Sequence, residues 1–403
     1  MSLPAGFAQA AVALRRGAIT LALVSASAVA RLVDGVAKVP PAQWDACAGT
    51  ANPFLSHAFM SILEESGSVS PRSGWQAVPI IVDGADGTPV AIAPAYAKRH
   101  SQGEYVFDHA WADAWERAGG SYYPKLQIAV PFTPAPGPRL LLRDRAAAPA
   151  LIAAIEAVVD RHGMSSAHAT FVSSDQVALF EAAGWLIRAG TQFHWANDGY
   201  PSFDDFLGVL ASRKRKAIRK ERAGAVEGLT IRHVTGAALT ERDWDAFWVF
   251  YQDTGSRKWG QPYLTRAFFS LLGERMGDRV LLMLAERGGR AIAGALNLIG
   301  ADTLYGRYWG CTEEVPFLHF ELCYYQAIEA AIARGLKFVE AGAQGEHKLA
   351  RGYAPVTTWS AHYLPDPNFR RAVADFLVRE RAAVAADQTY LGAMTPFRKA
   401  EAG

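Results

Sequence analysis

The clearest pattern of hydrophobic and polar positions in the chain lies between residues 303 and 365. An alternating run over residues 304–309 predicts a strand. Pro316 then stands where its fixed φ suits the first turn of a helix. Small or apolar side chains follow at helical spacing, at Phe317, Phe320, Tyr324, Ala327 and Ala331. Gly335 is placed to end that helix, and a second strand begins at Phe338. This order predicts a polar loop after residue 340 at the carboxyl end of a strand, where open α/β sheets place ligands.

The same pattern analysis predicts that the whole chain repeats one α/β unit. The first half contains helices over 40–66, hairpin strands over 75–82 and 89–96, a helix over 146–161, and strands over 167–172 and 185–194. The second half contains helices over 241–251 and 264–272, hairpin strands over 280–285 and 291–299, the segment above, and a strand over 357–363. We therefore predict a mixed α/β (α+β) fold, each sheet flanked by helices. The predicted divisions are a leader and first-strand region over 1–30, domains over 31–200 and 201–387, and a tail over 388–403.

The N-terminal segment has two interpretations. Arg15 and Arg16 precede a short apolar run, and Ala28–Val29–Ala30 resembles a signal-peptidase site, which is consistent with a secretory signal. The alternative is a leader followed by the first strand, and the interruption of the run by Ser25 and Ser27 favours it. No segment reaches the about 18–20 unbroken apolar residues of a membrane span. We therefore predict no membrane span.

Composition narrows the class of protein. The 403 residues are 50% hydrophobic and 20% charged, which is typical of a globular protein with two domains. A net charge of only +2 excludes a global attraction to nucleic acid or membrane, so any such contact depends on a local patch. Cys47, Cys311 and Cys323 have no metal-ligand spacing and cannot all pair. We predict a cytoplasmic protein without a bound metal.

One local patch is strongly basic. Residues 213–222 contain seven basic side chains, on a predicted helix that continues from residue 206 and buries Ala217 or Ile218. That helix presents a stripe of Arg215, Arg219 and Arg222, which suits the phosphates of a nucleotide carrier, coenzyme A or tRNA. A solvated helix face with no ligand is the alternative.

The polar loop after residue 340 contains the candidates for catalysis. The Lys348 ammonium could stabilise an oxyanion or hold a phosphate. His347 or Glu346 could accept a proton from an attacking amine. Gln344 in the same loop and Arg307 on the preceding strand are predicted to contact substrate. The alternative for Glu346 and His347 is a charged surface loop.

A second group of candidates lies in the first half. Charged and aromatic side chains are dense over residues 103–127, and this mixture is typical of polar-ligand sites. The predicted substrate contacts are Asp108, His109, Trp111, Tyr123 and Lys125. Aromatic packing between domains is the alternative. The sequence has no Gly-x-Ser-x-Gly elbow, dinucleotide fingerprint or Walker loop.

Three segments together resemble one family: GEYVFDHAWADAWERAGGSYYPKLQIAVPFTPAPGPRLLL (103–142), SRKRKAIRKERA (212–223) and GAQGEHKLARGYAPV (342–356). They resemble the bacterial FemAB-like proteins of the GNAT acyltransferase superfamily, over roughly residues 40–385. The resemblance implies two GNAT-like domains and an N-acyltransferase. Characterised relatives move an amino acid from aminoacyl-tRNA to an amine of a cell-wall precursor. Lys348, Gly352 and Tyr353 are similar to the family's late lysine–glycine–aromatic element, which implies catalytic roles for Lys348 and Tyr353.

The resemblance leaves the donor open. The phosphate-binding loop of ordinary GNAT enzymes is absent, and Glu313 and Glu314 occupy the corresponding stretch. The expected co-substrate is acyl-coenzyme A or aminoacyl-tRNA, with no tightly bound cofactor, and the expected acceptor is a small-molecule amine or cell-wall precursor. The alternatives are a non-catalytic module that recognises a peptidoglycan fragment or nucleotide-linked ligand, and a structural partner of cell-wall enzymes. The oligomeric state is left open.

Overall fold

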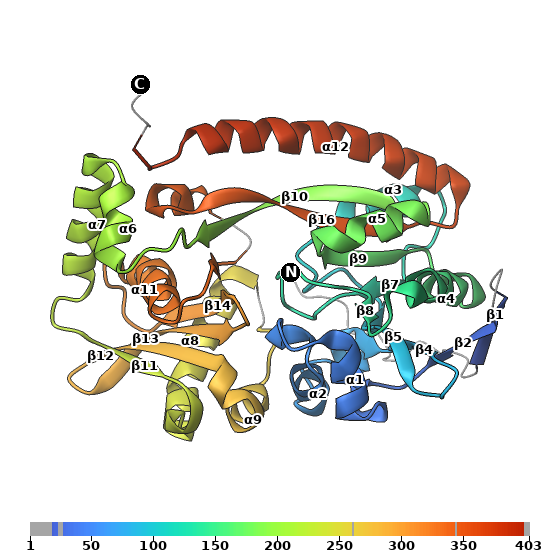
Figure 1. Cartoon of the computed structure of the whole chain (residues 1–403), viewed down its shortest axis with the longest axis horizontal. Coiled ribbons are helices and arrows are strands. Elements are labelled where there is room, and N and C mark those ends of the chain that lie inside the picture. Colours follow the sequence, from blue (N-terminus) through green and yellow to red (C-terminus); the bar gives the residue numbers. More distant parts are fainter. Residues whose placement is uncertain (1–17, 23–26, 260–261, 343–344, 399–403) are drawn as a thin grey trace.

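Two α/β units lie side by side and share one continuous sheet (Figure 1). The computed structural model describes residues 18–22, 27–259, 262–342 and 345–398. Within these ranges the shared sheet has the order β11-β12-β13-β14-β15-β10-β16-β9-β7-β6-β3. Its strands are β3 (Trp75–Ala77), β6 (Ala95–Lys98), β7 (Lys125–Ile128), β9 (Ala167–Val172), β10 (Leu186–Ala196), β11 (Thr230–Val234), β12 (Val280–Arg287), β13 (Arg290–Ile299), β14 (Thr303–Cys311), β15 (Phe338–Glu340) and β16 (Ala354–Tyr363).

The first half adds a smaller antiparallel sheet and a set of helices. The smaller sheet has the order β1-β2-β4-β5-β8, with β1 (Ala18–Ala22), β2 (Ser27–Leu32), β4 (Ile80–Asp83), β5 (Pro89–Ala93) and β8 (Leu141–Leu142). The helices are α1 (Pro41–Ala48), α2 (His57–Glu65), α3 (His109–Arg117), α4 (Ala148–Arg161) and α5 (Ser174–Ala182). Apolar side chains of α4, including Leu151, Ile155 and Val158, are fully buried and pack this helix against the sheets.

The second half covers β11–β15 with helices. These are α6 (Phe203–Val209), α7 (Ser212–Ala225), α8 (Glu241–Trp259), α9 (Arg266–Met276), α10 (Leu318–Phe320) and α11 (Gln326–Ala333), with a π-helical segment, η7 (Glu321–Tyr325), between the last two. Aromatic side chains join the two halves in one core: the rings of Phe54 and Tyr305 are 5.0 Å apart, and those of Phe59 and Phe268 are 5.9 Å apart. Burial of such large rings contributes strongly to the stability of both halves together.

The two halves also exchange strands. β10 ends the first half but pairs with β15 and β16 of the second half, while β16 pairs with β9 of the first. The long helix α12 (Pro367–Ala393) runs along β10 and β16 across both halves (Figure 1). Arg188 of β10 forms an ion pair with Glu380 of α12 at 2.6 Å. The shared sheet therefore depends on residues from both ends of the chain.

Three details differ from the pattern analysis. The basic helix does not continue from residue 206, because Leu210 has an extended ψ of 153° and separates α6 from α7. The helix expected at Pro316 begins two residues later, after Phe317 in a left-handed conformation with φ of 65°. The pattern analysis missed α12. No helix in the described ranges is long and apolar enough to cross a bilayer.

Candidate active site

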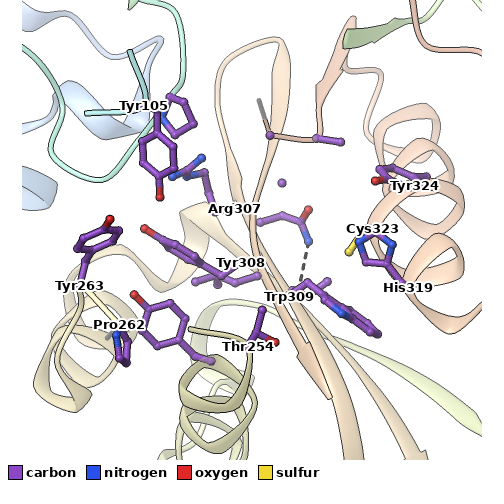
Figure 2. Close-up of a pocket in the computed structure, with 18 of the residues that line it drawn as sticks. Tyr105, Thr254, Pro262, Tyr263, Arg307, Tyr308, Trp309, His319, Cys323 and Tyr324 are labelled. Carbon is purple, nitrogen blue, oxygen red and sulfur yellow. Dashed lines mark hydrogen bonds between the residues drawn. The ribbon is translucent and has the colours of Figure 1, made fainter. Parts of the chain in front are cut away.

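A cavity lined by both halves opens where two parallel strands separate. β14 pairs with β15 only through Thr303–Phe338, Leu304–Val339 and Tyr305–Glu340, after which β15 ends and β14 continues to Cys311. A pocket of about 260 Å³ lies beside the unpaired part of β14 (Figure 2). Residues of both halves line it, including Tyr105, Phe107 and Pro134 from the first half and Tyr251, Tyr263 and Tyr324 from the second. The site therefore exists only in the assembled chain.

A bulge in β14 forms one wall of this cavity. Leu296 pairs with Tyr308 and Asn297 pairs with Gly306, so Arg307 is an extra residue with no opposite partner. Such a bulge interrupts the ladder of backbone hydrogen bonds and bends the strand. Gly306 permits a close approach at this point, since a Cβ there would lie 3.3 Å from the Glu340 carbonyl oxygen. The bulge therefore places, in the cavity wall, a backbone segment that is not fully paired in the sheet.

The wall beside the bulge is rich in phenols. The Arg307 guanidinium donates to the Phe132 carbonyl at 2.5 Å, and the Tyr308 hydroxyl donates to the same oxygen at 3.2 Å. Tyr105 and Tyr263 point toward this group (Figure 2). Burial raises the pKa of Tyr105, and the Tyr308 phenol adds to this effect while Arg307 opposes it. Burial also raises the pKa of Tyr263. These phenols therefore stay neutral and can donate hydrogen bonds.

The opposite wall comes from the helical segment after β14. His319, Cys323 and Tyr324 line it (Figure 2). Cys323 and Tyr324 lie in η7, and π-helical turns of this kind occur frequently at functional sites. The Tyr324 hydroxyl lies 2.8 Å from Nε2 of His347, a residue of the polar loop. The hydroxyl therefore connects the cavity to an exposed imidazole.

Lys348 lies directly behind the cavity wall. Its side chain is buried, and Nζ donates to the carbonyl of Gly342, a residue that lines the cavity, at 2.7 Å. Burial lowers the pKa of Lys348 to about 8, and Cys323 opposes this effect. The loop is fixed by Gly352, which has a φ of 88° and where a Cβ would lie 2.7 Å from Phe206. Tyr353 is also buried, and burial raises the pKa of its phenol.

Two loop candidates lie wholly or partly outside the described part of the chain. Gln344 lies outside the described residues, and so does the side chain of Glu346. Their substrate-binding and catalytic roles stay predictions. The structure brings Arg307, Lys348, His347 and Tyr353 around one region but leaves Lys348 and Tyr353 behind its wall.

The candidates of the first half form a separate buried cluster. The Tyr122 hydroxyl donates to Asp108 at 2.6 Å, and Lys125 donates to Glu104 at 2.7 Å and also to Asp108. Burial opposes ionisation of Asp108, but Lys125 and His168 outweigh it and lower the pKa of Asp108. Trp111 is buried against His362, whereas His109 is exposed. Tyr105 and Phe107, which line the cavity, lie between Glu104 and Asp108 of this cluster in the sequence.

The arginines of the predicted phosphate stripe contact protein groups. Arg222 binds Glu321 at 2.9 Å and Glu329 at 2.7 Å, and Arg219 binds Asp204 at 3.0 Å. Arg215 donates to the Gly208 carbonyl at 3.3 Å. Of Ala217 and Ile218, α7 buries Ile218, and it also buries Ala225 near its end. Exposed cations remain on this helix at Arg213, Lys214, Lys216 and Lys220.

Sequence analysis missed most residues of the cavity. Three remote segments contribute Tyr105, Tyr251, Tyr263 and Tyr308 to the cavity, and none of these four is among the predicted site residues. The pattern GRYWG in β14 offered one signal, because glycines beside aromatic residues in a strand mark bulges and close approaches. In the described ranges no group of His, Cys, Asp and Glu side chains is arranged to hold a metal ion.

Two mixed α/β units share one sheet, and a cavity lies where its parallel strands β14 and β15 separate. The chain belongs to the FemAB-like family, described as peptidoglycan biosynthesis/recognition, whose profile matches residues 35–399. That description spans both biosynthetic and recognition roles.

Comparison with the solved structure of FemX supports the fold, and two further structures are weaker matches. The FemX structure matches with a TM-score of 0.52 and 11% identity, over 83% of this chain and 98% of FemX. L-PGS from Bacillus licheniformis matches with a TM-score of 0.48 and 11% identity, over 81% and 98% of the two chains. A tandem GNAT protein from the clavulanic acid biosynthesis pathway matches with a TM-score of 0.44 and 14% identity, over 84% and 99%. A search of curated protein sequences gives no match.

Proposed function

We propose that the protein transfers an acyl or aminoacyl group from an activated donor to an amine in the cavity beside β14. The observation that carries this proposal is the separation of β14 from β15 after residue 305, which opens a cavity against a bulged backbone. Acyl transfer to an amine needs an electrophilic carbonyl held near groups that stabilise its developing negative charge. The acceptor is a small-molecule amine or a cell-wall precursor, in keeping with the family's description.

Stabilisation of the oxyanion is assigned to the bulge and to Lys348. Arg307 has no opposite partner in the ladder and lines the cavity, and we assign its backbone N–H as a donor toward the reacting carbonyl. The Lys348 ammonium binds the Gly342 carbonyl in the cavity wall and adds positive potential close to the reacting carbonyl. Burial strengthens that potential, since few waters screen a charge of this kind.

Removal of the amine proton is assigned to Tyr324 and His347. The Tyr324 hydroxyl accepts a proton from the attacking amine while it gives its own proton to Nε2 of His347. The phenol ends neutral, and the exposed imidazole releases the proton to water. As the new amide bond forms, the bond between the carbonyl carbon and the donor's leaving group breaks, and a leaving ribose oxygen takes up a proton from water.

An aminoacyl-tRNA donor is favoured over acyl-coenzyme A. The segment between β14 and α10, where a pyrophosphate would lie in an ordinary GNAT enzyme, carries Glu313 and Glu314. Glu313 is partly neutralised by Arg287 and Arg290, yet the segment offers no cation of its own. The exposed cations of α7 provide a surface for a polyanion.

A salt titration distinguishes the two donors. Filter binding of total aminoacylated tRNA should weaken steeply with salt, with a log–log slope near −3 for about four phosphate contacts. A variant with Lys214, Lys216 and Lys220 changed to Gln should bind more weakly and with a shallower slope. The matched control is Arg279→Gln, which removes one charge distant from α7. Tight, salt-insensitive binding of acetyl-coenzyme A with no binding of tRNA at low salt would reject this donor.

A further inference from the structure

The end of the cavity beside the bulge combines one guanidinium with several phenols. Arg307, Tyr105, Tyr263 and Tyr308 meet there, and the described residues that line the cavity include no Asp or Glu (Figure 2). Burial raises the pKa of Tyr105 and Tyr263, so both phenols stay neutral and can donate, whereas Tyr308 already donates its hydroxyl proton to the Phe132 carbonyl. This end of the cavity therefore presents donors and one positive charge.

The positive charge of Arg307 is not matched by an ion pair. In the part of the chain that the structure describes, no carboxylate lies within ion-pair distance of its guanidinium, and its Nε has no hydrogen-bond partner. Of its five N–H donors, one binds the Phe132 carbonyl and another contacts the Tyr308 hydroxyl. Glu340 lies close enough for Arg307 to lower its pKa, but burial dominates and raises that pKa to about 8. Glu340 is therefore largely protonated near neutral pH and leaves the arginine charge uncompensated.

The chemistry of these groups selects the class of ligand. An ammonium group would be repelled by Arg307 and would find no carboxylate in the lining. A phosphate dianion usually gathers several cations or a helix N-terminus, and this end has a single cation. A carboxylate carries one negative charge and accepts several hydrogen bonds, which matches one guanidinium and the neighbouring phenols. The aromatic rings around it suit a compact apolar body.

We propose that Arg307 and the adjacent phenols bind the carboxylate of the acceptor, so that its amine extends toward the wall of His319 and Tyr324. This inference rests on the proposed function, because it takes the amine acceptor from it. It assigns the acceptor to a substrate class, compact molecules that carry both an amine and a carboxylate. The carboxylate fixes the orientation of the acceptor, and Tyr324 meets the amine.

Calorimetric titration without any donor tests the carboxylate subsite separately from turnover. The probes are phenylacetate, phenylacetamide and benzylphosphonate, which share one ring and differ in the polar group. We expect phenylacetate to bind at least tenfold more tightly than the other two. Arg307→Gln should weaken phenylacetate at least tenfold and leave phenylacetamide within twofold. Tyr105→Phe, which removes one hydroxyl, should weaken phenylacetate about threefold to tenfold.

The control is Arg275→Gln, which removes a surface arginine paired with Glu65 and should change nothing. Equal binding of phenylacetate and phenylacetamide overturns the inference, as does absence of phenylacetate binding. Tighter binding of benzylphosphonate overturns it in favour of a phosphate. An equal loss of both phenylacetate and phenylacetamide in Arg307→Gln also overturns it. Carboxylate selectivity in a protein that transfers no acyl group would leave the subsite standing and reject the proposed function.

Discussion

Single residues at the site are held in ionisation states that differ from those in water. Glu340 is the clearest example, because burial raises its pKa to about 8 although Arg307 and Arg139 oppose the shift. Nδ1 of His194 lies 3.9 Å from its carboxylate, and burial lowers the pKa of that imidazole to about 4. Near neutral pH the pair is therefore mostly uncharged. Because this pair is mostly uncharged, it adds little negative charge to the surroundings of Arg307.

Glu340→Gln should change how stability depends on pH. The native carboxyl retains its proton up to about pH 8, whereas in the unfolded chain it loses the proton near pH 4. The wild type therefore loses stability as pH rises between these values. Glutamine cannot ionise, so the variant should gain on the order of 1–3 kcal/mol over wild type at pH 8 and little at pH 4. Urea unfolding at both pH values measures this, with the exposed Glu227→Gln as control. An equal change in unfolding free energy at both pH values would show that folding does not raise the pKa of Glu340.

Ion pairs connect the basic helix α7 to the polar loop and to the helical wall of the cavity. Glu221 of α7 binds Arg351 of the polar loop at 2.9 Å and also accepts from the Tyr325 hydroxyl. Arg222 of the same helix binds Glu321, which is almost fully buried at the start of η7. The basic helix thus supports the helical wall of the cavity as well as presenting cations to solvent.

Arg222→Ala should be strongly destabilising. It leaves Glu321 as a buried charge without its arginine, a change that costs about 3 kcal/mol or more. Arg219→Ala, on the same helix, breaks an exposed pair with Asp204 and should cost less than about 0.5 kcal/mol. Chemical denaturation of both variants provides the comparison. Similar losses of unfolding free energy in the two variants would show that the buried pair with Glu321 stabilises the fold no more than the exposed pair does.

The elements around the site were predictable from sequence because they are local. Pro316, Gly335 and the apolar spacing between them identified the strand–helix–strand order, which the structure contains. The helix α12 was missed although Phe369, Val373 and Leu377 follow helical spacing and are buried. The cavity could not be predicted, because Tyr105, Tyr263 and Tyr308 meet only through long-range packing. Pairing of β16 with β9, about 190 residues apart, likewise leaves no local signal.

At the scale of the whole molecule, the halves are not independent. β10 and β16 place strands of each half beside those of the other, and α12 covers both. The aromatic contacts between Phe54 and Tyr305 add a common core. The cavity takes residues from both halves, so it forms only when the halves dock.

Differential scanning calorimetry should therefore record one cooperative transition. Strand exchange and a shared core leave neither half with a complete sheet when the other unfolds. A fragment of residues 27–200 lacks β16 and α12 and should not unfold cooperatively by itself. Two well-separated transitions, or a fragment with a transition of its own, would contradict the dependence of one half on the other.

The measurement that tests the account most directly is transfer of a labelled aminoacyl group by wild type and Lys348→Met. Radiolabelled aminoacyl-tRNA is incubated with a pool of compact amino acids and soluble amine-bearing cell-wall precursors, and alkali-stable amide product is counted. Wild type should form labelled amide, and Lys348→Met should lose at least 100-fold in rate while it keeps its affinity for phenylacetate, because it loses oxyanion stabilisation of about 3 kcal/mol. Lys348→Arg, which retains the charge, is the matched variant and should recover part of the rate. Equal rates in wild type and Lys348→Met, or no amide product from wild type with either aminoacyl-tRNA or acetyl-coenzyme A, would contradict the account.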